Sequence, residues 1–146
     1  MSPSIATGAN EVPSNEALPL SLPGEALGRD AQGRPVLIGC VCKSCGNRMF
    51  PVVPVCSVCM SEEIEPEHMP REGTLYSFTF VHIGPAAWAK PFALGYIDLS
   101  NGVRVFSHLR GLSLRIDETV ELAAAEIGRN PDGTEIATFV FQPVPA

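Results

Sequence analysis

Two Cys-x-x-Cys pairs constrain this chain more than any other feature of its sequence. Cys42 and Cys45 form the first pair, and Cys56 and Cys59 form the second after a ten-residue spacer. Four soft thiolates in a tetrahedron select zinc, and a site closed by four protein ligands is structural rather than catalytic. The pattern therefore predicts one structural zinc ion held by these four cysteines, on two knuckles joined by a short hairpin. The alternatives are disulfides or buried free thiols.

A fifth cysteine, Cys40, is left over once four are assigned to the metal. We expect it to be a small buried apolar residue on the strand that enters the first knuckle, because free cysteine packs as a small hydrophobic side chain. The alternatives are a fifth, competing ligand or a nucleophile. A free thiol beside a zinc site fits a reducing compartment.

Charge and hydropathy restrict the classes of partner. The net charge of the 146-residue chain is −6, and its only lysines are Lys43 and Lys90. This argues against a broad nucleic-acid surface, which needs clustered positive charge. No apolar stretch approaches the roughly 20 residues of a membrane span, and the N-terminus lacks the pattern of a signal peptide. We therefore expect a cytoplasmic protein that does not bind membranes.

The remaining pattern is mainly β, with turn signals between short apolar runs. We expect an extended arm over residues 1–27, a rubredoxin-like zinc ribbon over 28–70 and a C-terminal five-stranded OB-fold barrel over 71–146. The ribbon begins with a strand over 35–41, and its acidic residues 61–70 look like a linker. Barrel strands are expected in the runs after residue 73, at 92–99, 103–109, 119–123 and 136–141, with Asn101-Gly102 supplying the positive φ values of a hairpin turn.

The order of these motifs resembles a known family. A strand leads into Cys-x-x-Cys-Gly, then come a Phe-Pro spacer, the second pair, an acidic segment, the run GTLYSFT from residue 73 and the run PFALGYIDL from residue 91. This order is similar to that of the zinc-ribbon plus OB-fold proteins that accompany thiolase-type enzymes, long catalogued as a domain of unknown function. The resemblance covers roughly residues 28–143. A short N-terminal arm, without the long helical lead of many members, is closer to the thiolase-partner type.

That resemblance implies a function. Members of the family look like non-catalytic subunits or fused domains that associate with thiolases, aldolases or acyltransferases and help to bind the CoA part of the substrate. It implies a thiolase-like catalytic homodimer as partner, an α2β2 heterotetramer, and a 3-oxoacyl-CoA substrate in a β-oxidation pathway, such as the aromatic benzoylsuccinyl-CoA. The partner is then expected to supply the nucleophilic cysteine and its acid–base residues.

The residues themselves give no sign of catalysis in this chain. The sequence holds no nucleophile elbow, phosphate-binding P-loop, dinucleotide glycine motif or His-Glu-x-x-His zinc site. Its three histidines are scattered: His68 follows acidic residues, His82 ends a strand, and His108 falls on the polar face of a strand, where we expect it to be solvated. We expect no catalytic residue here.

Recruitment of an acyl-CoA needs a few cations, an aromatic face and free backbone groups. The candidate CoA contacts are Lys43, Arg48, His82, Lys90, Phe92 and Arg104. Trp88, the only tryptophan, lies in an apolar loop and is a candidate contact for the partner protein, because tryptophan is enriched at interface hot spots. For each residue the alternative is a solubilising or packing role.

A second hypothesis is a zinc-ribbon OB-fold protein that binds single-stranded nucleic acid. OB folds hold single strands with a basic groove and stacked aromatic rings. Aromatic residues are present on the expected strands, but the net charge has the wrong sign. A fold alone does not choose between these functions.

Overall fold

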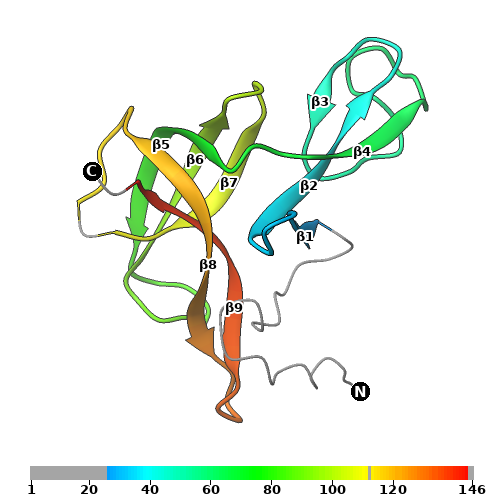
Figure 1. Cartoon of the computed structure of the whole chain (residues 1–146). Helices are drawn as coiled ribbons and strands as arrows, with labels where there is room; N and C mark the ends of the chain where they lie inside the picture. Colours follow the sequence, from blue (N-terminus) through cyan, green and yellow to red (C-terminus); the bar gives the residue numbers. More distant parts are fainter. Residues whose placement is uncertain (1–25, 112, 145–146) are drawn as a thin grey trace.

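A computed structural model describes residues 26–111 and 113–144, and this part of the chain contains strands and no helix. Most of the predicted N-terminal arm lies outside the described residues. Figure 1 shows two bodies side by side, a small sheet and a closed barrel. The strands are β1 (Leu27–Arg29), β2 (Pro35–Cys42), β3 (Arg48–Met49), β4 (Ile64–His68), β5 (Glu72–Val81), β6 (Phe92–Leu99), β7 (Arg104–Leu109), β8 (Thr119–Arg129) and β9 (Glu135–Pro143).

The small sheet is built around β2, which pairs antiparallel with β1, β3 and β4. The prediction that residues 61–70 form a linker is wrong for β4, since Ile64–His68 pairs with Ile38–Cys42 over five positions. β4 is an edge strand, and its central Pro66 is tolerated there because an edge strand needs no N–H on its open side.

The barrel closes in the order β5-β6-β7-β9-β8, with β8 pairing back onto β5. Its strands are antiparallel except β7 and β9, which run parallel. This arrangement confirms the prediction of a mainly β protein with a five-stranded OB-fold barrel. Closure leaves no long free sheet edge, which protects the barrel from pairing with other chains.

Alternation along the strands decides which side chains fill the barrel. Val103, Val105, Ser107 and Leu109 are all buried, as the period-two pattern of this segment predicts. The preceding turn differs in one respect from the prediction: Gly102 has a positive φ of 92°, whereas Asn101 is not among the residues with positive φ. The Asn101 side chain instead accepts a hydrogen bond from the backbone N–H of Val103 at 3.1 Å.

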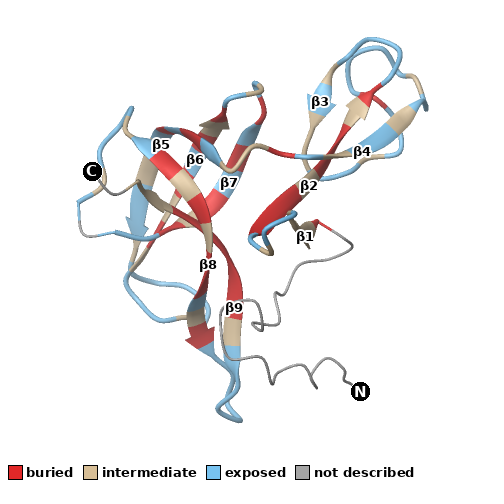
Figure 2. Cartoon of the chain, in the orientation of Figure 1, coloured by how far each residue is buried: buried red, intermediate tan, exposed pale blue. Residues whose placement is uncertain are grey.

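The two bodies share one apolar core. Figure 2 shows buried segments both on β2 and on the barrel strands. Leu37 of β2 and Met69 belong to the same buried cluster as Leu75 and Leu122 of the barrel. Arg71 fastens the junction, because its guanidinium donates to the carbonyl oxygens of Pro35 in β2 and Leu122 in β8. The ring of Phe50 also meets that of Phe139 edge-on at 6.3 Å.

Candidate functional site

Two tight turns of equal geometry hold the four paired cysteines. In the first knuckle, the N–H of Gly46 donates to the carbonyl of Cys42 at 2.8 Å. In the second, the N–H of Met60 donates to the carbonyl of Cys56 at 3.0 Å. Each turn places two thiols on the same side, and the β2–β4 pairing brings the two turns face to face.

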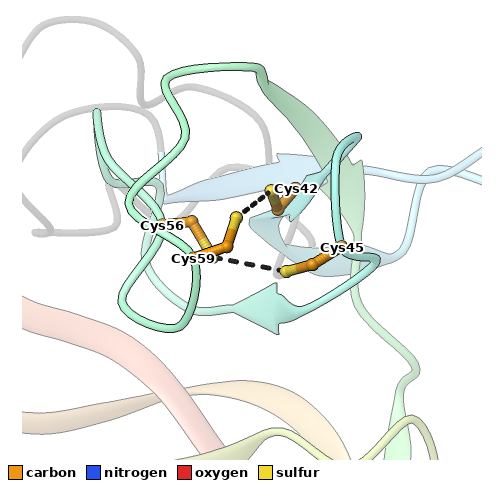
Figure 3. A group of neighbouring side chains, drawn as sticks. All are labelled: Cys42, Cys45, Cys56 and Cys59. Carbon is orange, nitrogen blue, oxygen red and sulfur yellow. Dashed lines mark hydrogen bonds between the residues drawn. The ribbon is translucent and has the colours of Figure 1, made fainter.

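The four sulfur atoms converge on one point, as Figure 3 shows. All four Sγ atoms lie within 4.8 Å of one another. Cys42 Sγ is 3.5 Å from Cys59 Sγ, and Cys45 Sγ is 3.6 Å from Cys56 Sγ. A zinc ion with Zn–S bonds of about 2.3 Å needs sulfur atoms about 3.8 Å apart. The separations are also far too long for disulfides, whose sulfur atoms lie about 2 Å apart. The group therefore fits one zinc ion.

The electrostatics of the cluster also favour a cation. Backbone N–H groups of Cys59 and Val58 donate to Cys56 Sγ and lower the pKa of that thiol to about 6. The N–H of Ser61 acts in the same direction on Cys59, but Cys42, burial and the other two thiols outweigh it and raise the pKa of Cys59 to about 12. Four adjacent thiols thus resist joint ionisation without a positive charge among them.

Cys40 does not join this group. Its side chain is fully buried on β2, and Sγ lies 4.0 Å from the carbonyl oxygen of Pro51. It behaves as the small buried apolar residue that the sequence predicts, and it is not among the four converging cysteines.

A second cluster forms on the outer surface of the barrel, around His108. The His108 ring lies 4.9 Å from the Trp88 ring and 5.2 Å from the Phe92 ring, measured between centroids. Its Nε2 is buried without a hydrogen-bond partner, and burial lowers the pKa of His108 below its ordinary value. The prediction that His108 is solvated is therefore wrong, because the connection between β5 and β6, residues 82–91, packs Trp88 against it; we call this connection the Trp88 loop.

The loop is held in this place by its backbone rather than by the tryptophan ring alone. Trp88 forms a β-bridge with Gly128 in β8. The N–H of Ala89 donates to Ile127, and the N–H of Arg129 donates to Ala87. Gly128 has to lack a side chain, because a Cβ there would lie 2.0 Å from the carbonyl oxygen of Ala87. Trp88 is consequently half-buried within the protein.

The same outer face of the barrel carries exposed aromatic rings. Tyr96 and Phe106 lie opposite each other on β6 and β7, with ring centroids 5.0 Å apart. The Arg104 guanidinium lies 3.7 Å from the centroid of the Tyr76 ring. It also donates to Asp98 through two nitrogen atoms, which lowers the pKa of that carboxyl. This face is thus aromatic and locally neutral.

The candidate CoA contacts are distributed over both bodies. On the ribbon, Lys43 pairs with Glu65 and Arg48 pairs with Glu67. Lys90 donates to the carbonyls of Pro85 and Trp88 within its own loop. The structure brings together Lys90, Phe92 and the Trp88 loop, leaves His82 exposed at the start of that loop, and keeps Arg104 with Asp98.

Sequence reasoning missed two further cations. Arg110 and Arg115 lie in the exposed connection between β7 and β8. Within the described ranges, neither guanidinium has an ion-pair partner, unlike those of Arg48 and Arg104. The run RGLSLR could have indicated them, because arginine side chains in a loop between barrel strands are available to bind an anionic ligand. Over the described residues, the structure contains no helix long and apolar enough to span a membrane.

Comparisons with known proteins match this chain to a family. Residues 29–65 match the family described as "ChsH2, rubredoxin-like zinc ribbon domain", and residues 67–125 match "ChsH2, C-terminal OB-fold domain". The chain is 38% identical over 123 residues to "Benzoylsuccinyl-CoA thiolase subunit BbsA" of Thauera aromatica, covering 82% of this chain and 85% of that protein. It is also 38% identical over 114 residues to the subunit of the same name from Geobacter metallireducens, covering 77% of each.

Among solved structures, the chain is similar to one described as "Ltp2-ChsH2(DUF35) aldolase". The TM-score is 0.61 at 26% identity, and the match covers 77% of this chain and 86% of that one. Fold, cysteine geometry and sequence agree, so this chain belongs to the ChsH2-type family of zinc-ribbon and OB-fold proteins.

Proposed function

We propose that this chain is a non-catalytic subunit of a thiolase-type enzyme that acts on a 3-oxoacyl-CoA. The observation that carries the proposal is the match over most of both chains to BbsA, a protein named as a thiolase subunit. The similar solved structure is named for a ChsH2 protein together with an aldolase, which supports an accessory role beside a carbon–carbon bond-cleaving enzyme.

The side chains of the protein support a non-catalytic role. Catalysis by a serine or cysteine nucleophile requires a base within hydrogen-bond reach. In the described part of the chain, no hydrogen bond joins a histidine side chain to a serine, threonine or cysteine side chain, and His108 Nε2 has no partner at all. Four of the five cysteines form the metal cluster, and Cys40 is buried.

The role of the chain is then to build and stabilise the enzyme complex. We propose an α2β2 heterotetramer around a catalytic homodimer, since such assemblies are usually symmetric. A structural zinc ion at the four paired cysteines stabilises the ribbon. The ribbon, residues 28–70, and the barrel, residues 71–146, act as the two functional units of the chain. We also propose an aromatic substrate such as benzoylsuccinyl-CoA, which the name of the relative BbsA supports, and a place in cytoplasmic β-oxidation.

A part in binding CoA belongs to the same proposal. The CoA phosphates need cations, and its adenine needs an apolar face. Lys90, His82 and Phe92 remain candidates at the Trp88 loop, and Arg110 and Arg115 add guanidinium groups without an ion-pair partner in the described ranges. To bind a CoA phosphate, three further candidates would first have to release the carboxylates with which they form ion pairs: Lys43, Arg48 and Arg104. Trp88 remains a candidate partner contact through its exposed part.

Co-expression with a thiolase-type catalytic subunit tests the proposal directly. We expect the two chains to elute as one species in size-exclusion chromatography, with a mass of two copies of each by light scattering. The complex should cleave its acyl-CoA faster than the catalytic subunit alone. Separate elution, or full activity of the catalytic subunit without this chain, would contradict the proposal.

The second candidate, binding of single-stranded nucleic acid, has one observation in its favour: Tyr96 and Phe106 form an exposed aromatic pair on the barrel face. The neighbouring cation Arg104 is neutralised by Asp98, and the chain carries a net charge of −6. Since phosphate contacts supply most of such affinity, we expect no appreciable binding at physiological salt. A titration that gives sub-micromolar affinity with a steep salt dependence would promote this candidate.

A further inference from the structure

The two knuckles are closed by the same kind of backbone hydrogen bond but differ in the residue that follows the second cysteine. Gly46 occupies this position in the first knuckle, with a φ of 82°, and Met60 occupies it in the second, with a φ of 68°. Both residues donate the hydrogen bond that closes the turn. Glycine adopts this left-handed conformation without steric cost, whereas a side chain with a Cβ does not.

No packing interaction within the described part of the chain explains why this position is a methionine. The Met60 side chain is 72% exposed, so it contributes no core packing. A strained backbone position with an unburied apolar side chain is more simply explained by a contact outside the chain than by stability of the chain itself.

Other exposed apolar groups lie beside Met60. Val58, inside the same knuckle, is 68% exposed, and Val55, next to the first cysteine of the pair, is 36% exposed. We call Val55, Val58 and Met60 the second-knuckle face. Because the zinc cluster fixes the backbone of the knuckle, these side chains are presented on a rigid support, which reduces the entropy lost on binding.

Unpaired acidic groups border this face. Glu62 and Glu63 follow the knuckle directly, and the carbonyl of Glu63 accepts the N–H of Lys43 in the first knuckle. Within residues 26–111 and 113–144, neither carboxylate forms an ion pair, while the neighbouring Glu65 and Glu67 are paired with Lys43 and Arg48. The second knuckle thus carries exposed apolar side chains, and two exposed acidic residues, without an ion pair in the described part of the chain, follow it in the sequence.

We propose that the second-knuckle face docks into an apolar recess with a basic rim on the catalytic subunit. This inference rests on the proposed function and names one surface through which the subunits meet, in addition to the candidate contact at Trp88. Aliphatic side chains at the centre of an interface and charges at its edge are the usual arrangement of a protein–protein contact.

The negative charges of Glu62 and Glu63 also limit which molecules can bind the second-knuckle face. Phospholipid headgroups and nucleic acids carry phosphates, which Glu62 and Glu63 repel. A second copy of this chain packed face to face would bring four carboxylates together. A protein surface with lysine or arginine around an apolar recess satisfies both parts of the face, and it gains on-rate from the opposite charges.

Substitutions at Met60 separate docking from folding. Met60→Asn keeps a residue that tolerates positive φ and removes the apolar side chain. With full-length chain and purified catalytic subunit, we expect isothermal titration calorimetry to show a Kd raised about tenfold or more, as for loss of one interface hot spot. Zinc content should be unchanged and the Tm no lower than that of the wild type.

Two further variants complete the test. Glu62→Lys with Glu63→Lys should raise the Kd at low salt and lose most of that effect at high salt, since exposed charges are screened. Ile116→Ser removes a side chain that is 50% exposed in the β7–β8 connection and serves as the matched control, with no expected change in Kd.

The outcomes distinguish this inference from the proposed function. If the wild-type chain binds the catalytic subunit and Met60→Asn binds equally well, the docking surface is wrong and the accessory role stands. If the wild-type chain does not bind, the proposed function and this surface both fail. Loss of zinc or a lower Tm in Met60→Asn would make Met60 a structural residue, and concentration-dependent dimers of the chain alone that disappear in Met60→Asn would identify a second copy as the occupant.

Discussion

The ribbon and the barrel are built from the same kind of strand but are held together by different forces. The fully buried residues at the tip of the ribbon are cysteines, Cys40, Cys42 and Cys56, while Val52, Val55, Val58 and Met60 are exposed there. The barrel instead buries large apolar side chains such as Phe141, Ile97 and Leu122 almost completely. We therefore expect the ribbon tip to depend on a bound metal ion for its stability, whereas the barrel depends on the hydrophobic effect.

Removal of one thiol should have the largest effect on stability, and it should affect the ribbon and not the barrel. We expect Cys45→Ser to lose zinc and unfold the knuckles, because zinc binding at such sites contributes on the order of 10–16 kcal/mol to folding. The barrel should keep its protection in amide hydrogen exchange. Elemental analysis that finds one zinc per chain in Cys45→Ser, or no zinc in the wild type, would contradict the assignment.

Removing a barrel side chain tests the opposite half. Phe141 is fully buried in the shared cluster, so Phe141→Ala should lower the free energy of unfolding by about 4 kcal/mol through lost burial and a residual cavity. Zinc content of the folded fraction should not change. Chemical denaturation followed by circular dichroism measures the loss, and a change below about 1 kcal/mol would show that the cluster relaxes around the cavity.

The joint between the two bodies should show an intermediate effect. Arg71→Met keeps the aliphatic stem but removes the hydrogen bonds to Pro35 and Leu122. Since hydrogen bonds to a charged donor contribute roughly 1.5–3 kcal/mol each, we expect the loss of these two bonds to cost about 3 kcal/mol. Hydrogen exchange should rise at the start of β2 and leave the knuckles unchanged. Arg34→Met, which removes an exposed pair with Asp30 in the β1–β2 turn, is the control.

The sequence predicted the barrel well because its signals are local. Alternation in β7 and the glycine at position 102 set strand, face and turn without reference to distant residues. The ribbon strand β4 was missed because its acids and Pro66 are typical of a linker, and only pairing with β2 makes it a strand. The four cysteines were predicted to meet because their spacing alone constrains them.

What the sequence did not indicate depends on contacts between distant segments. The site of His108 is made by a loop that bridges to Gly128, and the role of Arg71 depends on carbonyls of two other strands. Met60 illustrates a further case: the sequence shows an ordinary methionine, and only its positive φ together with its exposure indicates a function.

The smallest expected effect concerns the Trp88 loop on the barrel. Burial lowers the pKa of His108 in the folded state, so the fold favours neutral imidazole. The stability from this site is complete above the unfolded pKa of about 6.5 and declines as the pH falls through the lower folded value. Trp88 is the only tryptophan, so its fluorescence reports the loop directly. Between pH 8 and pH 5 we expect its emission to change only below about 6.5.

Two variants assign that transition. His108→Phe fills the same place between Trp88 and Phe92 without a titrating group and should abolish the change. His82→Gln removes an exposed histidine at the start of the same loop and should retain it. A transition that persists in His108→Phe and disappears in His82→Gln would mean that the loop responds to solvent-exposed charge instead. In that case an exposed group, and not the apolar interior of the barrel, would control the conformation of the Trp88 loop. The barrel would share this dependence on a group outside its apolar core with the ribbon.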